Sequence, residues 1–261
     1  MHGAVQKTDD EYLHQVRVAL RRLRVVLNMT AKYRDDTELQ SLRHLVSELG
    51  RALGSSREWD VFVAETLPAI LKDAGDYTEM EMLIGASEKR RQDSQQLVHA
   101  ALQPVDFQRL LLRFGAWMNG EYWKKSANPI NIQYFSNKML CKYEQKVWQR
   151  GKHVQSKMTN EQLHRLRIAC KNLRYSIELF DSPTGLENDH YLKKLINLQS
   201  VLGKLHDNAV ALNLLNEFRQ GNRLTHIALI RDVIERHHSH HLSKLSEAWQ
   251  KFKKLKVNQN E

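Results

Sequence analysis

One eleven-residue pattern occurs twice in this chain, at residues 14–24 and 164–174. Both copies place a histidine first and basic residues at the fourth, eighth and eleventh positions. On an α-helix, which turns about 100° per residue, these positions fall within roughly 80° of one face. The apolar residues repeat as well and fall on the opposite face. The pattern therefore predicts two related amphipathic helices, each with one buried face and one row of cations.

We call these two rows of cations the first ridge and the second ridge. The first ridge consists of His14, Arg17, Arg21 and Arg24, and the second of His164, Arg167, Lys171 and Arg174. A solvated surface is the ordinary explanation of one basic helix face, but such a face would accept glutamate, which pairs favourably with arginine or lysine. Neither copy contains an acidic residue, and the order of residues is the same in both. The ridges are therefore predicted to bind an anion and to face each other across one shared channel.

The charge of the whole chain supports an anionic partner. Its 261 residues include 40 Lys and Arg against 30 Asp and Glu, a net charge of +10, which favours polyanions over neutral ligands. The two cysteines, Cys141 and Cys170, do not suggest a disulfide framework, so we expect a cytoplasmic protein. No apolar run reaches the roughly 18 residues of a membrane span, and the N-terminus lacks the apolar core of a signal peptide.

Helical periodicity covers most of the chain, which is punctuated by only four prolines and eleven glycines. The sequence therefore predicts an all-α fold. Capping residues precede both ridge helices, at Thr8-Asp9-Asp10-Glu11 and Thr159-Asn160-Glu161-Gln162, and Asp181–Gly185 is expected to end the second. The expected helices span 9–30, 37–53, 57–73, 76–101, 104–123, 131–156, 159–181, 188–203, 206–219 and 223–255.

A second repeat relates residues 49–61 to residues 198–210. In each copy we expect a glycine to end one helix, a cation to lie near the start of the next, and an acid to cap it. These residues are Gly54, Arg57 and Glu58 in the first copy, and Gly203, His206 and Asp207 in the second.

The repeats divide the chain into halves, 1–126 and 127–261, joined near Ser126–Pro129. Helix 131–156 precedes the second ridge and carries Lys138, Lys142, Lys146 and Arg150, for which a solvated face and an anion site are equally good explanations. The duplication predicts a matching helix before the first ridge, at roughly −19 to 6 on the repeat spacing. We therefore expect that the first half lacks this helix or that the chain is part of a longer protein.

The paired H-x-x-R-[VI]-x-x-[RK]-x-L-R blocks, each followed by L-G-x-x-[RH]-[ED], resemble the CHAD domain, the conserved histidine α-helical domain. The resemblance covers nearly the whole chain and implies one domain over 1–261, built as two pseudo-symmetric helical bundles around a basic central channel. It also implies binding of inorganic polyphosphate, association with polyphosphate granules, and a CYTH triphosphatase domain, upstream or separate, as a partner. The basic positions of the family fall on both ridges and on Arg22, Arg57, Lys204 and His206.

The predicted function is non-catalytic binding of polyphosphate, with no cofactor, metal or catalytic residue. The binding residues are expected to be His14, Arg17, Arg21, Arg22, Arg24, Arg57, Lys138, Lys142, Lys146, His164, Arg167, Lys171, Arg174, Lys204 and His206. A phosphate polymer requires repeated cations but no aromatic platforms, which nucleic acid would favour. Apart from Tyr175, just beyond the second ridge, the ridges lack aromatic residues, so we expect no specific nucleic-acid partner.

Two other functions stay open at this point. One is a metal-dependent helical phosphohydrolase that would use His14, His164, His206 and Asp207 as ligands, although the surrounding cations would repel a divalent ion. The other is a nonspecific nucleic-acid or granule-scaffold protein. The histidine-rich run at 236–241 and the lysines that follow it are expected to be solvated surface, with adventitious metal binding as the alternative.

Overall fold

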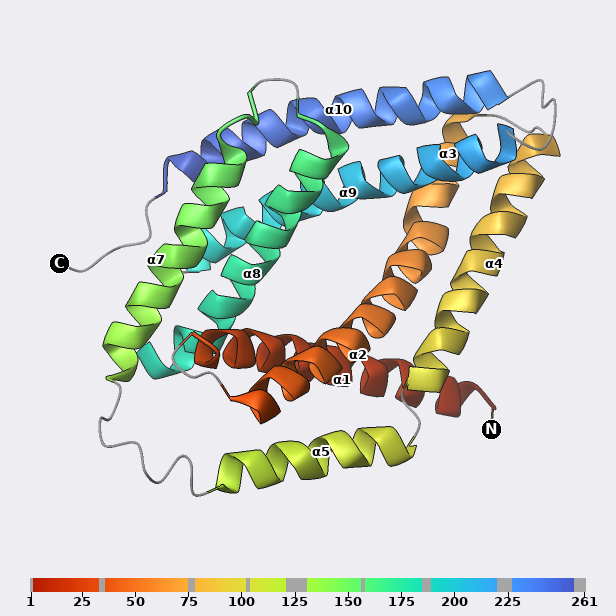
Figure 1. The fold of residues 1–261 in the computed structure, drawn as a ribbon. Coiled ribbons are helices and arrows are strands. Elements are labelled where there is room, and N and C mark those ends of the chain that lie inside the picture. The colour runs from red at the N-terminus through yellow and green to blue at the C-terminus, as the bar shows by residue number, and fades with distance from the viewer. Residues whose placement is uncertain are drawn as a thin grey trace. The chain divides into compact units, whose positions relative to one another are not determined.

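The computed structural model describes residues 2–32, 36–74, 78–101, 104–120, 131–155, 158–184, 189–219 and 227–255. Over these residues the fold is helical and contains no strand, which confirms the predicted all-α class (Figure 1). The helices are α1 (His2–Thr30), α2 (Thr37–Val61), the π-helical segment η1 (Phe62–Thr66), α3 (Leu67–Ala74), α4 (Thr78–Ala101), α5 (Pro104–Asn119), α7 (Ile132–Gly151), α8 (Asn160–Thr184), α9 (Asp189–Arg219) and α10 (Ile227–Lys253).

The two helix ends predicted at glycines are wrong. Helix α2 continues through Gly54 and passes into η1 and α3, and α9 continues through Gly203. A glycine inside a helix costs only about 1 kcal/mol, whereas in α9 a stripe of buried residues, including Leu198, Leu202 and Leu205, runs past the glycine without interruption. Burial of this stripe outweighs the local preference in α9. Arg57 and Glu58 on α2, and His206 and Asp207 on α9, therefore lie within helices and not at helix starts.

Two other predicted boundaries move outward. Helix α1 begins at His2 and not near Thr8, because no glycine or proline separates residues 4–8 from the ridge. The cap at Thr8 is therefore wrong. Helix α8 runs to Thr184, three residues beyond the predicted end at 181. The predicted junction at Ser126–Pro129 lies outside the described residues.

The contacts divide the chain into two compact units. Unit 1 comprises residues 1–59 and 91–131, and unit 2 comprises residues 60–90 and 132–261. Residues 60–90 thus group with the C-terminal part of the chain, although the sequence repeat assigns them to the first half. The halves defined by the repeat stay a prediction, because the units reflect contacts and not sequence similarity.

Unit 1 is held by the apolar faces of α1 and α2, and by residues of α4 and α5 that pack against them. Its buried cluster comprises Leu20, Leu27, Leu39, Leu42, Val46, Leu53, Val98 and Leu110. Leu20 and Leu27 belong to the apolar stripe predicted opposite the first ridge, and Val16 and Leu23 pack against the same cluster. The predicted burial of this stripe is confirmed for these residues.

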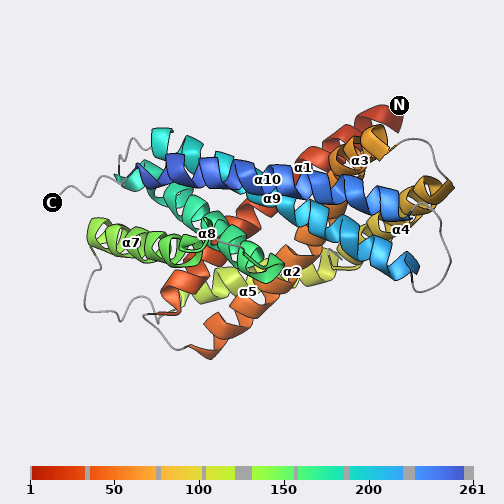
Figure 2. The ribbon, with the colours of Figure 1, turned by 90° about the horizontal axis from the view of Figure 1, so that it is seen from above.

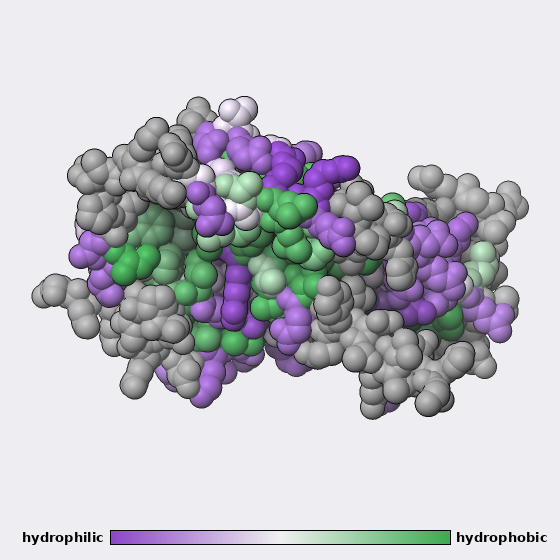
Figure 3. All heavy atoms as spheres, turned by 90° about the horizontal axis from the view of Figure 1, so that it is seen from below, coloured by the Kyte–Doolittle hydropathy of each residue, from purple (hydrophilic) through white to green (hydrophobic). Residues whose placement is uncertain are grey.

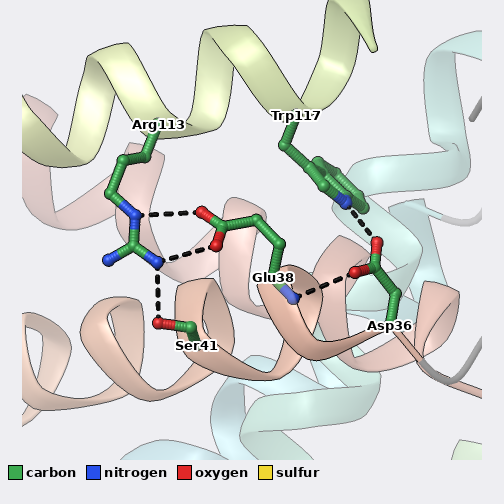
Figure 4. Close-up of polar contacts among 5 residues, drawn as sticks. All are labelled: Asp36, Glu38, Ser41, Arg113 and Trp117. Carbon is green, nitrogen blue, oxygen red and sulfur yellow. Dashed lines mark hydrogen bonds and ion pairs between the residues drawn. The ribbon is translucent and has the colours of Figure 1, made fainter. Parts of the chain in front are cut away.

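Polar contacts join α5 to the start of α2 within unit 1 (Figure 4). The carboxylate of Asp36 accepts hydrogen bonds from the backbone N–H of Glu38 at 2.9 Å and from the indole Nε1 of Trp117 at 2.6 Å. Arg113 donates to both carboxylate oxygens of Glu38, at 2.9 and 2.8 Å, and to the hydroxyl of Ser41 at 2.8 Å. Asp36 therefore caps α2 and at the same time connects it to α5.

Unit 2 is built around α9, which lies alongside α10 in both views and also packs against α8 and η1 (Figures 1 and 2). Helix α7 pairs with α8. An aromatic cluster joins α7 to α10: the ring of Trp148 lies 5.4 Å from that of Trp249 and 5.3 Å from that of Phe252. Gly151, at the end of α7, is buried directly against the indole of Trp249. This contact requires a residue without a side chain.

Apolar residues also reach the surface. On α5, Leu112 is 74% exposed, and Leu111 and Met118 are exposed as well. Figure 3 views the molecule from below and shows hydrophobic residues at the surface between hydrophilic ones. None of the described helices is both long and apolar enough to cross a bilayer.

Candidate anion-binding site

The second ridge lies on α8, whose start is defined by a reciprocal cap. The backbone N–H of Gln162 donates to the hydroxyl of Thr159 at 3.2 Å, and the backbone N–H of Thr159 donates to Oε1 of Gln162 at 2.8 Å. This capping box confirms the predicted start of the helix. The face opposite the ridge is buried, as predicted, through Leu163, Leu166, Cys170, Leu173 and Ile177. The cap and the buried face together set the rotation of α8 and so the direction of its cations.

The ridge itself is less uniform than its sequence suggests. His164 is exposed, and Lys171 and Arg174 are partly exposed, but Arg167 is only 8% exposed. The expectation that no ridge residue packs is therefore wrong for Arg167, which lies among the side chains of the unit.

The eleven residues of the second ridge contain no acid, but an acidic residue pairs with the ridge from outside them. One turn beyond it, Glu178 accepts a hydrogen bond from Nε of Arg174 at 2.6 Å. Nη1 of Arg174 also donates to Oε1 of Gln199 on α9, at 3.3 Å. Both partners restrict the guanidinium to one region. Glu178 lies outside both repeats, and Gln199 lies in the second repeat at a position that was not assigned a role, so neither was predicted.

Helix α9 meets the ridge at a second point, near the start of α8. The imidazole rings of His164 and His206 lie 5.5 Å apart. They line a cavity of about 210 Å³ together with Asn160, Asn213 and apolar residues of the two helices. The structure thus brings together the histidines of both motifs in unit 2.

The acid of the second motif has a structural contact. The hydroxyl of Thr66, in η1, lies 3.4 Å from Oδ2 of Asp207 and donates to it. Asp207 therefore links η1 to the middle of α9, and its predicted role as a helix cap is wrong. Lys204, one turn earlier on α9, is exposed.

The first ridge and the second ridge lie in different units. Of the first ridge, the side chain of His14 lies outside the described residues, Arg17 and Arg21 are partly exposed, and Arg24 is exposed. Arg22, beside this ridge on α1, and Arg57, on α2, are exposed as well. That the two ridges face each other across a channel stays a prediction.

The basic stripe of α7 is exposed at Lys138, Lys142, Lys146 and Arg150. Unlike the ridges it is interleaved with aromatic residues. The ammonium of Lys138 lies 5.8 Å from the ring centre of the exposed Tyr134, and that of Lys146 lies 5.5 Å from the ring centre of Tyr143. Such contacts hold the lysine stems on the helix surface and leave the ammonium groups accessible.

The histidine run of α10 is not simply solvated surface, which corrects the prediction for residues 236–241. Nε2 of His237 lies 2.7 Å from Oδ2 of Asp73 on α3, and Nδ1 of His241 lies 3.1 Å from Nδ2 of the buried Asn208 on α9. Burial, together with the smaller effects of the nearby Lys204, His240, His237 and Lys244, lowers the pKa of His241 to about 4. His241 is therefore neutral at pH 7 and accepts a hydrogen bond from Asn208. Lys251, Lys253 and Lys254, farther along, are exposed as expected.

Groups suited to metal or nucleophilic chemistry do not gather in this site. Among the described residues, no three His, Cys, Asp or Glu side chains converge as metal ligands. Cys141 and Cys170 are free thiols, and burial raises the pKa of the Cys170 thiol. The arrangement can bind an anion through charge and hydrogen bonds.

Comparisons with known proteins identify the class to which this all-helical protein belongs. The sequence profile of the CHAD domain matches residues 2–216, so the chain belongs to the CHAD domain family. This family is associated with polyphosphate binding. No curated protein sequence matches the chain.

Two solved structures resemble the protein. The CHAD domain from the plant Ricinus communis superposes with a TM-score of 0.71 at 28% identity, covering 94% of this chain and 82% of the plant chain. PptA from Streptomyces chartreusis superposes with a TM-score of 0.66 at 11% identity, covering 96% and 92% of the two chains, and shows likeness of fold alone.

Proposed function

We propose that this protein binds inorganic polyphosphate without hydrolysing it. The observation that carries the proposal is the meeting of α8 and α9, where side chains of the two sequence motifs lie next to each other: the ring of His164 lies 5.5 Å from that of His206, and Arg174 reaches α9 through Gln199. Polyphosphate presents closely spaced negative oxygens along a flexible chain. Arginine forks and ammonium groups on two adjacent helices match that chemistry.

The other cations extend the proposed surface. Lys204 on α9, Lys138, Lys142 and Lys146 on α7, and in unit 1 Arg17, Arg21, Arg22, Arg24 and Arg57 are all at least partly exposed. Within either unit a long polymer would contact several of these cations at once, which supports polyphosphate over a single phosphate ion. Binding should then weaken steeply with salt, because each neutralised phosphate releases a counterion.

The test is titration with long-chain polyphosphate of wild type and of two matched double variants. Lys171→Glu with Lys204→Glu reverses charge on α8 and α9, while Lys253→Glu with Lys254→Glu makes the same change on exposed residues of the C-terminal segment. Arg21 is unsuitable because its Nε is buried. Each reversal in the site loses a charge-assisted hydrogen bond of roughly 1.5–3 kcal/mol, so affinity should fall at least about a hundredfold.

The control pair should bind nearly as well as wild type, and circular dichroism should show the same helix content for all three proteins. Equal losses in both pairs would mean that net charge alone determines binding. Nucleic acid is the best second candidate ligand, because the exposed Tyr134 lies beside Lys138. Competition with DNA of equal charge at physiological salt distinguishes binding of polyphosphate from binding of nucleic acid.

A separate assay tests whether the protein hydrolyses polyphosphate. Purified protein incubated with polyphosphate and magnesium or manganese should release no orthophosphate above background. Release that is abolished by His206→Ala with Asp207→Ala would overturn this part of the proposal. Association with polyphosphate granules and association with a CYTH triphosphatase both stay predictions. Co-purification from polyphosphate-containing cells would test them.

A further inference from the structure

Gly203 lies in the middle of α9. A glycine inside a helix is unfavourable, and the common structural reason for keeping one is close packing of a neighbour. Gly151 shows that reason, because a Cβ there would lie 1.9 Å from the indole of Trp249. At Gly203 a Cβ would meet no atom within 4 Å among the described residues, the helix's own backbone aside. The protein's own packing therefore does not explain this glycine.

The two points at which α9 meets the second ridge lie on either side of Gly203. Gln199, which accepts a hydrogen bond from Arg174, lies four residues before it, and His206, next to His164, lies three residues after it. On a helix both positions fall within roughly 60° of the direction of Gly203. The open space at Gly203 is therefore on the side of α9 that α8 supplies with cations.

We propose that Gly203 determines access to the anion site, because its missing side chain leaves room for a polyphosphate chain to lie directly against α9. The inference rests on the proposed function. The phosphate chain would lie on the surface of α9 at this point, and Arg174 and His164 of α8 would lie beside it. A side chain at 203 would hold the phosphate chain away from the surface of α9 and from these donors. Gly203 is thus a positioning residue and donates nothing itself.

The sequence repeat provides a second instance of the same feature. Gly54 is the counterpart of Gly203 at the offset of 149 residues, it also lies inside a continuous helix, and a Cβ there would likewise meet nothing within 4 Å. Two helices therefore accept the cost of an interior glycine at equivalent positions, each three residues before a basic residue, Arg57 or His206. We expect Gly54 to act in the same way within unit 1.

The experiment compares substitutions that affect the helix equally but differ in location. Gly203→Ala and Gly203→Leu are matched by Gly85→Ala and Gly85→Leu. Gly85 is exposed in the middle of α4, also has open space around its Cβ position, and lies outside every motif. Both alanine variants should raise the Tm by about 2–4 °C, because alanine is the better helix former.

Only the variants at 203 should lose affinity for long-chain polyphosphate. Gly203→Leu should bind about tenfold more weakly, as for the loss of one charge-assisted hydrogen bond, and Gly203→Ala should show a smaller loss. A variant that is more stable than wild type but binds less well is the result expected if Gly203 serves ligand access and not folding.

The other possible results distinguish failure of the proposed function from failure of the inference about Gly203. If wild type does not bind polyphosphate, the proposed function fails, whatever the variants do. If wild type binds and both Gly203 variants bind equally well, the inference about Gly203 is overturned while the proposed function stands. If Gly203→Leu does not fold, the alanine variant decides, because its single Cβ has open space. A lower Tm for Gly203→Ala would show that the glycine serves folding, and would also overturn the inference.

Discussion

Substitution of Gly151 by alanine should destabilise unit 2 through one steric contact. An ideal Cβ at this position would lie 1.9, 2.2 and 2.5 Å from three carbons of the Trp249 indole, where ordinary contacts begin near 3.4 Å. The ring would have to move by about 1.5 Å. It has little freedom to do so, because Trp249 is 3% exposed and is packed against Trp148 and Phe252.

Overpacking of this kind lowers the free energy of unfolding by about 1–3 kcal/mol. Because the Trp249 ring has no space to move into, we expect about 3 kcal/mol for Gly151→Ala. At about 2–4 °C per kcal/mol, the Tm should fall by roughly 6–12 °C. Thermal unfolding followed by circular dichroism measures this change. Gly115→Ala, on α5, is the control, because a Cβ there would meet nothing within 4 Å and the Tm should not fall.

A double-mutant cycle identifies the cause. Trp249→Phe removes the ring carbons that the new methyl would strike, so Gly151→Ala should cost at least about 1 kcal/mol less in that background than in wild type. If the two changes are additive, or if Gly151→Ala leaves the Tm unchanged, the close contact between α7 and α10 does not exist as described.

Two further predictions concern polar contacts within the units. Trp117→Phe removes the hydrogen bond to the carboxylate of Asp36 and should lower the free energy of unfolding of unit 1 by about 1–2 kcal/mol, while Met118→Ala, exposed on the same helix, should change it much less. The Tm should fall as the pH decreases from 6.5 to about 4, because His241 then takes up a proton in the unfolded chain but stays neutral in the folded one. His241→Gln should reduce this loss, and Asn208→Asp should raise the pKa of His241. His190→Gln is the control, because His190 is exposed and is not among the groups that shift the pKa of His241, so it should do neither. An unchanged pH profile for His241→Gln would exclude His241 as the source.

The sequence predicted those elements whose determinants are local. Thr159 and Gln162 are three residues apart, so the capping box that starts α8 is visible in the sequence, and the apolar stripes of α1 and α8 follow from helical periodicity alone. The helix end at Gly203 was predicted wrongly because local preference was given more weight than the buried stripe that runs past this residue. Helix α2 likewise continues past Gly54.

Contacts between distant residues could not be predicted in this way. Arg113 and Glu38 are 75 residues apart, and Asn208 and His241 are 33 residues apart, so no spacing rule brings either pair together. Burial of Arg167 likewise depends on how α8 packs. The pairing of Arg174 with Glu178, four residues along the same helix, follows from spacing and could have been predicted. The repeat identified which residues carry the charge, and only the structure shows which of them are accessible.

The continuity of α9 has a consequence for the energetics of the site. Helix α9 has 31 residues and so extends for about 46 Å, and the segment 199–206 lies near its middle, two or more turns from either end. Helix ends fray, whereas central amides exchange their hydrogens with solvent only when larger parts of the unit open. The groups that α9 contributes are therefore held in place before any ligand arrives. A flexible polymer that binds there loses conformational entropy, whereas this part of the protein is already ordered and loses little.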